Sequence, residues 1–110
     1  MTARYHRHMG MSDTDFEKVL RDLLAHLRGR DPEYASTAEA VDELLPRGED
    51  QIAFELVVSA ICVCGVVVDE RLRAEVLRAF DEFDPEELAE DREWFLEAQS
   101  PQDERVPAAS

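Results

Sequence analysis

Residues 49–64, which read EDQIAFELVVSAICVC, form the stretch around which the rest of the chain is organised. On an α-helix with 3.6 residues per turn, their apolar side chains cover nearly the whole circumference. Only Glu55, Ser59 and Cys62 form a narrow polar sector. A helix that is apolar almost all round is buried on most sides, so this stretch predicts a central helix. It is too short for a membrane span, which needs about 20 residues.

The two ends of this stretch carry signals for helix termini. Glu49 and Asp50 suit the positive end of a helix dipole, and Gly65 suits a C-terminal cap. The β-branched run between them also fits a buried strand, because continuous apolarity does not separate the two; length and end signals favour the helix. If this helix is buried, Leu56→Asp should unfold the protein, because a buried unpaired charge costs several kcal/mol.

The flanking segments show the spacing of amphipathic helices. Apolar residues three and four apart from Phe16 to Leu27 predict one buried face, and Thr14 and Glu17 have the spacing of a capping box. Residues 66–68 predict an extended bridge that fills the core. The predicted helices span residues 13–28, 31 or 36 to 45, 49–64, 69–83 and 84 to about 97. The fold class is therefore all-α, a small antiparallel bundle of four to five helices joined by short turns.

Length and cysteine usage define the organisation of the chain. The 110 residues are enough for one small domain. We expect a single helical domain over residues 12–99, a disordered N-terminal arm over 1–11 and a disordered C-terminal tail over 100–110. Two cysteines, no apolar signal sequence and no long apolar span indicate a cytoplasmic protein that does not contact membranes.

The net charge narrows the class of partner. The chain has 26 acidic against 12 basic residues, which gives a formal net charge of −14. Such a surface repels nucleic acid and anionic membranes and attracts basic partners over distance. We therefore expect a basic protein partner and no direct contact with nucleic acid, and the oligomeric state stays open.

Catalytic and metal-binding motifs are missing from the sequence. It contains no Gly-rich phosphate loop, no Ser nucleophile elbow and no zinc-finger spacing. Cys62 and Cys64 lie two positions apart, so on a helix their side chains diverge by about 200° and do not share a metal ion or a disulfide. We expect no catalytic residue, no cofactor, no metal and no enzymatic activity.

The last predicted helix carries the candidate binding surface. Residues 81–97 hold nine acids and one base, Arg92, whereas helices 13–28 and 69–83 pair their surface charges at i,i+4. Trp94 projects beside the acids, and a large aromatic residue in a charged surround is typical of an interface anchor. A solvated face that keeps the protein soluble is the alternative. If that alternative holds, Glu39, Asp42, Glu43 and Glu49 are the next candidates. The candidate partner-binding residues are Glu86, Glu87, Glu90, Asp91, Glu93, Trp94 and Glu97, with Glu49, Asp50 and Glu55 of the central helix.

The segment from Thr37 to Leu96 resembles the MafI-like immunity proteins of bacterial polymorphic toxin systems. The likeness lies in ELLPRGE at 43–49, GEDQIAFELVVSAIC at 48–62, a short valine-rich bridge and DERLRAEVLRAF at 69–80. Gly48-Glu49 and the AFEL run at 53–56 match the family's G-E and A-L-E-x-L pattern, with Phe54 in place of Leu. The chain departs from the family at Cys62-Val63-Cys64, and the first predicted helix is poorly covered.

The resemblance implies a small acidic helical bundle that binds and neutralises a co-encoded toxin, often a nuclease with a basic active-site cleft. We therefore expect an immunity protein that occludes such a cleft with its acidic surface. A non-enzymatic helical adaptor or regulator that binds a basic protein is the alternative function.

Overall fold

The predicted central helix is present as α3, Asp50–Cys64, in the computed structural model, which describes residues 10–100. Three helices pack against α3: α1 (Asp13–Leu27), α2 (Tyr34–Leu44) and α5 (Pro85–Gln99). The remaining helix, α4 (Glu70–Phe80), packs on α1 and α5. A short 3₁₀ turn, η1 (Leu45–Arg47), joins α2 to α3. Residues 10–100 therefore form an all-α domain, as predicted.

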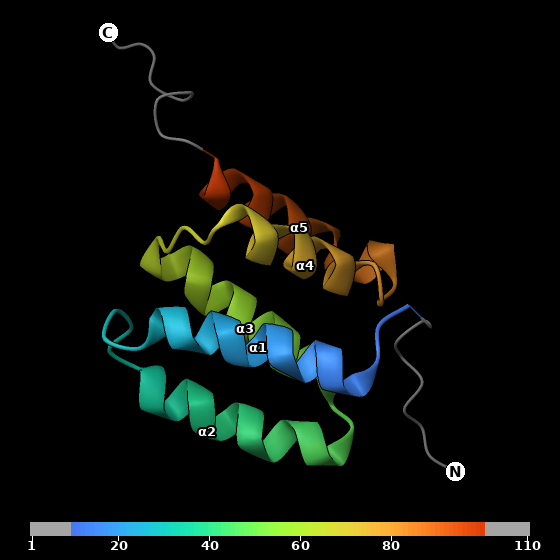
Figure 1. Cartoon of the computed structure of the whole chain (residues 1–110), viewed down its shortest axis with the longest axis horizontal. Helices are drawn as coiled ribbons and strands as arrows, with labels where there is room; N and C mark the ends of the chain where they lie inside the picture. Colours follow the sequence, from blue (N-terminus) through green and yellow to red (C-terminus); the bar gives the residue numbers. More distant parts are fainter. Residues whose placement is uncertain (1–9, 101–110) are drawn as a thin grey trace, which may run out of the picture.

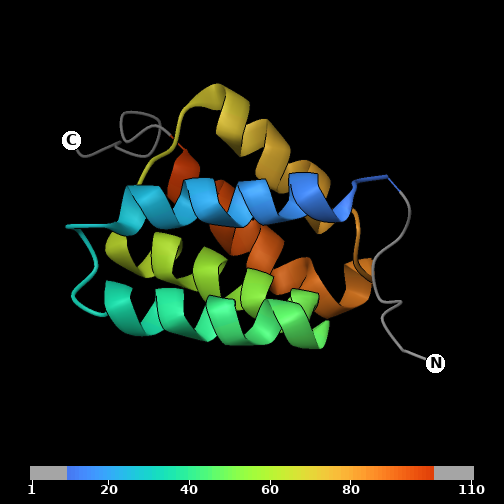
Figure 2. The same ribbon diagram turned by 60° about the horizontal axis from the view of Figure 1, so that its bottom comes forward.

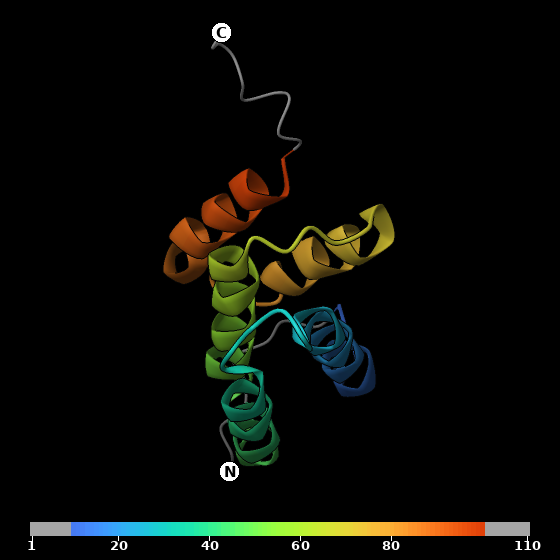
Figure 3. The same cartoon turned by 90° about the vertical axis from the view of Figure 1, so that its left-hand side faces the viewer.

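Successive helices alternate in direction along the chain (Figure 1). Because of this alternation, α1, α3 and α5 all run the same way. α1 and α2 lie along two sides of α3 (Figure 2), and both contact it. The end-on view places α5 on a further side of α3, away from α2 (Figure 3). None of the helices in residues 10–100 combines the length and the apolarity that a membrane span requires.

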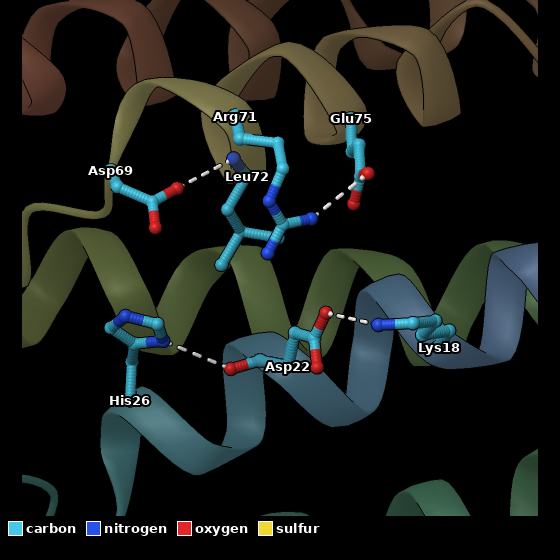
Figure 4. Close-up of polar contacts among 7 residues, drawn as sticks. All are labelled: Lys18, Asp22, His26, Asp69, Arg71, Leu72 and Glu75. Atoms are coloured by element: carbon cyan, nitrogen blue, oxygen red, sulfur yellow. Dashed lines mark hydrogen bonds and ion pairs between the residues drawn. The ribbon is translucent and has the colours of Figure 1, made fainter.

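Side-chain caps fix where the helices begin. Asp69 Oδ1 accepts a hydrogen bond from the Leu72 amide at 2.8 Å (Figure 4), and Asp84 caps α5 in the same way. The cap of α1 is Ser12, whose Oγ accepts from the Asp15 amide at 3.0 Å. The predicted capping box at Thr14 is therefore wrong by two residues. At the far end of α3, Gly65 adopts the left-handed conformation with φ 66° that the predicted cap requires.

Aromatic rings fill the centre of the core. The Phe54 ring of α3 lies 5.9 Å from Phe16, 4.8 Å from Phe80 and 5.7 Å from Phe83, measured between ring centroids. These rings come from α1, from the end of α4 and from the turn that follows it. Val66 and Val68 of the bridge after α3 are buried too, as predicted, whereas Val67 between them is 63% exposed. One contiguous core therefore joins every helix of the domain.

The buried side chain of Gln99 joins the end of α5 to the bridge after α3. Its Nε2 donates to the carbonyl oxygen of Val66 at 2.7 Å, and the amide of Val68 donates to its Oε1 at 2.9 Å. One side chain thus satisfies two backbone groups of a buried segment that has no strand partner. This pair of hydrogen bonds, hereafter the Gln99 clip, holds the C-terminal ends of α3 and α5 together.

Two predictions about the flanks of the domain are wrong. Met11 is buried in the core, so the first part of the predicted N-terminal arm belongs to the folded domain. The rest of that arm and residues 101–110 lie outside the described residues. The helix predicted to reach residue 83 ends at Phe80, and Glu82 is buried against Gly10, where an added Cβ would lie 2.8 Å from the Glu82 Oε2. Because α4 ends at Phe80, the following turn directs Glu82 and Phe83 inward.

Surface charges on α1 pair as predicted, whereas within residues 10–100 only one of the two predicted i,i+4 pairs of α4 forms, because Glu82, the predicted partner of Arg78, is buried. Lys18 bonds Asp22 at 3.2 Å and Arg71 bonds Glu75 at 3.1 Å, both across one helical turn (Figure 4). Arg21 pairs with Glu17 at 3.2 Å and also reaches Asp42 of α2 at 2.9 Å. Asp42, one of the reserve candidates for partner binding, is therefore engaged in an ion pair between α1 and α2.

Candidate protein-docking face

The acidic side chains of α5 lie at the surface without basic partners. Within residues 10–100, no ion pair involves α5. Its one base, Arg92, has Leu88, Ala89, Phe95 and Leu96 at the neighbouring i±3 and i±4 positions, so no acid of α5 is in register with it. The exposed or half-exposed acids of α5 are Glu86, Glu87, Glu90, Asp91, Glu93 and Glu97.

Trp94 stands at the edge of these acids with 41% of its surface exposed. It lies seven residues after Glu87 and three after Asp91, so the three side chains share one side of α5. That side faces α3, because Gln51 Nε2 donates to Glu87 Oε1 at 3.0 Å. The same amide nitrogen donates to Glu55 Oε2 at 3.2 Å. The structure thus brings Glu55 of α3 and Glu87 of α5 together around one neutral amide.

α3 is buried on most sides, as predicted, but the side between α2 and α5 is exposed although it carries apolar residues. Ile52, Leu56 and Val63 are 50%, 36% and 72% exposed, and Ser59 lies among them. No helix of residues 10–100 covers this side (Figure 3). Cys62 is buried. The expected unfolding by Leu56→Asp is therefore wrong, because water reaches that side chain.

We call Ile52, Leu56, Ser59 and Val63 the α3 seam. Their spacing of four, three and four residues is that of the a and d positions of a heptad repeat. A groove of about 440 Å³ runs along the seam from Leu56 to Val63, between these residues and the beginning of α2. The wall of the groove opposite the seam consists of Asp31, Pro32, Glu33 and Thr37, so two of its four residues are acidic.

A second groove, of about 640 Å³, lies on the other side of α5, against the end of α4. Phe80, Phe83 and Leu88 contribute apolar surface to it. Leu88 has non-helical backbone angles, φ −113° and ψ 15°, which kink α5 after its first turn. Because Arg92 lines this groove together with Asp81 and Glu93, charge there favours no particular partner.

The remaining predicted site residues lie at separate places. Glu49 is exposed at the N-terminal end of α3, before the α3 seam begins. Asp50 is 5% exposed, so the prediction that it contacts a partner is wrong. Acids in the first turn of a helix usually lie at the surface, but the Asp50 side chain is buried. Glu39 and Glu43 are exposed on α2.

The two cysteines occupy different surroundings. Burial, with a smaller effect from the negative charge of Asp91, raises the pKa of the Cys62 thiol to about 11. Desolvation and the charge of Asp31 also raise the pKa of the Cys64 thiol. Neither thiol forms a disulfide. Within the described residues, no group of three His, Cys, Asp or Glu side chains is arranged to hold a metal ion.

Cys62 is expected to resist alkylation in the folded protein. In a Cys64→Ala variant at pH 8, a pKa of about 11 leaves a thiolate fraction roughly two orders of magnitude below that of an ordinary cysteine. Iodoacetamide labelling followed by mass spectrometry measures the rate, with the same variant in guanidinium chloride as the control. Equal rates in the two conditions would show that the Cys62 thiol is not buried.

Comparison with protein-family models, with curated proteins and with solved structures finds no match to this chain.

Proposed function

We propose that this chain is a non-catalytic binding protein that occludes the basic surface of a protein partner, acting as the immunity protein of a bacterial toxin. The observation that carries the proposal is the row of unpaired acids on α5 with Trp94 at its edge. Like charges at i,i+3 and i,i+4 destabilise a helix by a few tenths of a kcal/mol per pair. A chain that pairs Glu17, Asp22 and Glu75 with bases on α1 and α4 retains this cost on α5, which favours a role in recognition.

Two further observations support this proposal. The net charge of −14 speeds encounter with a basic protein through long-range attraction. The resemblance of residues 37–96 to MafI-like immunity proteins adds the expectation of a toxin, often a nuclease. Neutralisation would then be steric, with the acidic face covering a cleft that otherwise binds a nucleic acid backbone.

The second candidate function is an adaptor or regulator that recruits a basic protein without inhibiting it. The exposed α3 seam fits an adaptor as well as it fits an immunity protein, because a helix of a recruited protein would dock on such a surface. Co-expression with the product of the neighbouring gene separates the two functions. An immunity protein restores growth to cells that this product alone arrests, and the purified chain inhibits it at equimolar ratio. A product that is harmless to cells and retains its activity in the complex would favour the adaptor.

Reversing charge on α5 is expected to slow association with the partner. The triple variant Glu86→Lys, Glu90→Lys, Glu93→Lys moves the formal net charge from −14 to −8. The association rate constant should fall about tenfold or more at low salt, and its salt dependence should flatten, because steering charges are removed. Surface plasmon resonance at two ionic strengths measures both effects. Trp94→Ala should instead raise the dissociation rate, since it removes an anchor.

A second triple variant, Asp15→Lys, Glu17→Lys, Glu70→Lys, is the matched control. It gives the same net charge but changes only exposed acids of α1 and α4, none of which is a candidate for partner binding. Thermal melts of both variants establish that the fold is retained. If both triple variants slow association equally, the effect is due to overall charge. If the α5 variant does not slow association, the α5 acids serve only to keep the protein soluble.

A further inference from the structure

We infer that the α3 seam is the docking site for an amphipathic helix of the partner, a helix that carries one apolar stripe flanked by Lys or Arg. This inference rests on the proposed function, from which it takes the basic character of the partner. It adds the place where the partner makes its apolar contacts and the kind of element that makes them.

The spacing of the seam specifies a helical occupant. Ile52, Leu56, Ser59 and Val63 occupy consecutive a- and d-type positions, and an α-helix rises about 17 Å over the 11 steps from the first to the last of them. A second helix with apolar residues at i, i+4, i+7 and i+11 presents knobs at the same intervals. The small Ser59 in the middle leaves room for a larger side chain of the opposing helix.

The acids on both sides of the seam specify the flanks of that helix. Asp31 and Glu33 line the groove on the α2 side. Glu55 and Glu87 gather around Gln51 on the α5 side. Arg30 lies near Cys64 at one end of the groove and offsets part of this charge. In coiled coils the positions that flank the seam select partners by charge, so an occupant with basic flanks is favoured over one with acidic flanks.

The same charges disfavour a second copy of this chain as the occupant. Two chains that each carry −14 repel one another. Packing α3 against α3 would also bring the acids that border one seam, Glu49 and Glu55, against those of the other. The chain's own basic segment at Arg4 and Arg7 lies outside the described residues, and the experiment below treats it as a competing occupant.

Leu56 and Leu96 provide a matched pair of variants, because they are 36% and 37% exposed and lie on different faces. The probe is a fluorescent synthetic peptide of about 18 residues, with Leu at the a and d positions and Lys at e and g. Leu56→Ser should weaken peptide binding about tenfold or more, whereas Leu96→Ser should change it less than about twofold. Fluorescence anisotropy measures the affinity, and emission of Trp94, the single tryptophan, reports binding independently.

A second peptide with Glu at e and g separates this inference from the proposed function. It should bind at least about tenfold more weakly than the Lys peptide. Loss of that preference, with Leu56 still required, would contradict the basic character of the partner and so the proposed function. If the Lys peptide is still preferred over the Glu peptide but Leu56→Ser does not change its affinity, the proposed function is supported and the seam is excluded as the docking site.

Two other results would overturn the inference. Tighter binding of both the Lys peptide and the Glu peptide after Arg4→Glu and Arg7→Glu would assign the seam to the chain's own basic segment, because added negative charge alone would weaken binding of the Glu peptide. Concentration-dependent dimerisation of the protein alone, lost in Leu56→Ser and retained in Leu96→Ser, would assign it to a second copy. Sedimentation velocity at several concentrations measures the latter.

Discussion

Phe54→Ala is expected to lower the free energy of unfolding by about 3–5 kcal/mol, which is the range for removing a buried aromatic ring. The Phe54 side chain is fully buried and contacts three other phenylalanine rings at centroid distances from 4.8 to 5.9 Å. These rings belong to separate elements that do not move together easily, so the cavity is not readily closed. Since small domains are stable by only about 5–15 kcal/mol, the variant should melt more than about 10 °C below the native protein.

Leu56→Ala, two residues further along the same helix, is the control for this prediction. Its side chain lies on the exposed α3 seam, so the loss should stay below about 1 kcal/mol. Urea unfolding followed by circular dichroism measures both variants. Similar losses for the two would contradict the orientation of α3, since they would place Leu56 in the core as well.

Gln99→Leu is expected to lower the free energy of unfolding by about 2–5 kcal/mol. The change leaves the Val66 carbonyl and the Val68 amide without the hydrogen bonds of the Gln99 clip. Each buried backbone group that loses its partner costs about 1–3 kcal/mol. Ser100→Ala is the neighbouring control, because its hydroxyl bonds only the Leu96 carbonyl at an exposed position. Equal melting temperatures for Gln99→Leu and the native protein would exclude the clip as a stabilising contact.

Gln99→Glu tests the hydrogen bond that Gln99 donates to the Val66 carbonyl, because the new side chain can donate only when it is protonated. A protonated carboxyl donates to the Val66 carbonyl, whereas an ionised one faces it without a proton, so folding raises the pKa of this new side chain. A raised pKa in the folded state means that the stability it confers is present at acid pH and is lost as pH rises. Relative to the native protein at each pH, the variant should therefore be least stable at neutral pH.

Periodicity and helix-end signals predicted most of the fold. The 3.6-residue spacing of Phe16 to Leu27 placed α1 to within a residue of its ends, and the same holds for residues 49–64 and α3. Gln99 could not be found this way. Its role depends on which backbone segment lies beside the end of α5, and no local pattern encodes that neighbour. The burial of Glu82 escaped prediction for a related reason, because it follows from where α4 ends.

The candidate site was predicted in part. Leu88 and Phe95 set the buried face of α5, so the exposure of Glu90 and Trp94 on other faces followed from helical geometry. The α3 seam was missed because an apolar side chain at the surface looks the same in a sequence as one in the core. Only the number of helices around α3 distinguishes them, and three helices leave one side open.

The Gln99 clip also connects binding to conformational equilibrium. Residues Val68 and Gln99 are 31 positions apart, so docking α5 onto α3 closes a long loop at an entropic cost. If α5 detached, Glu87 would separate from Gln51 and Glu55, and Trp94 would move away with it. The acidic face formed by α3 and α5 would then no longer exist. A partner that grips α3 and α5 at once therefore binds only the closed form and stabilises it in proportion to its concentration over its Kd. The partner would thus act on this fold as a ligand that locks its last helix in place.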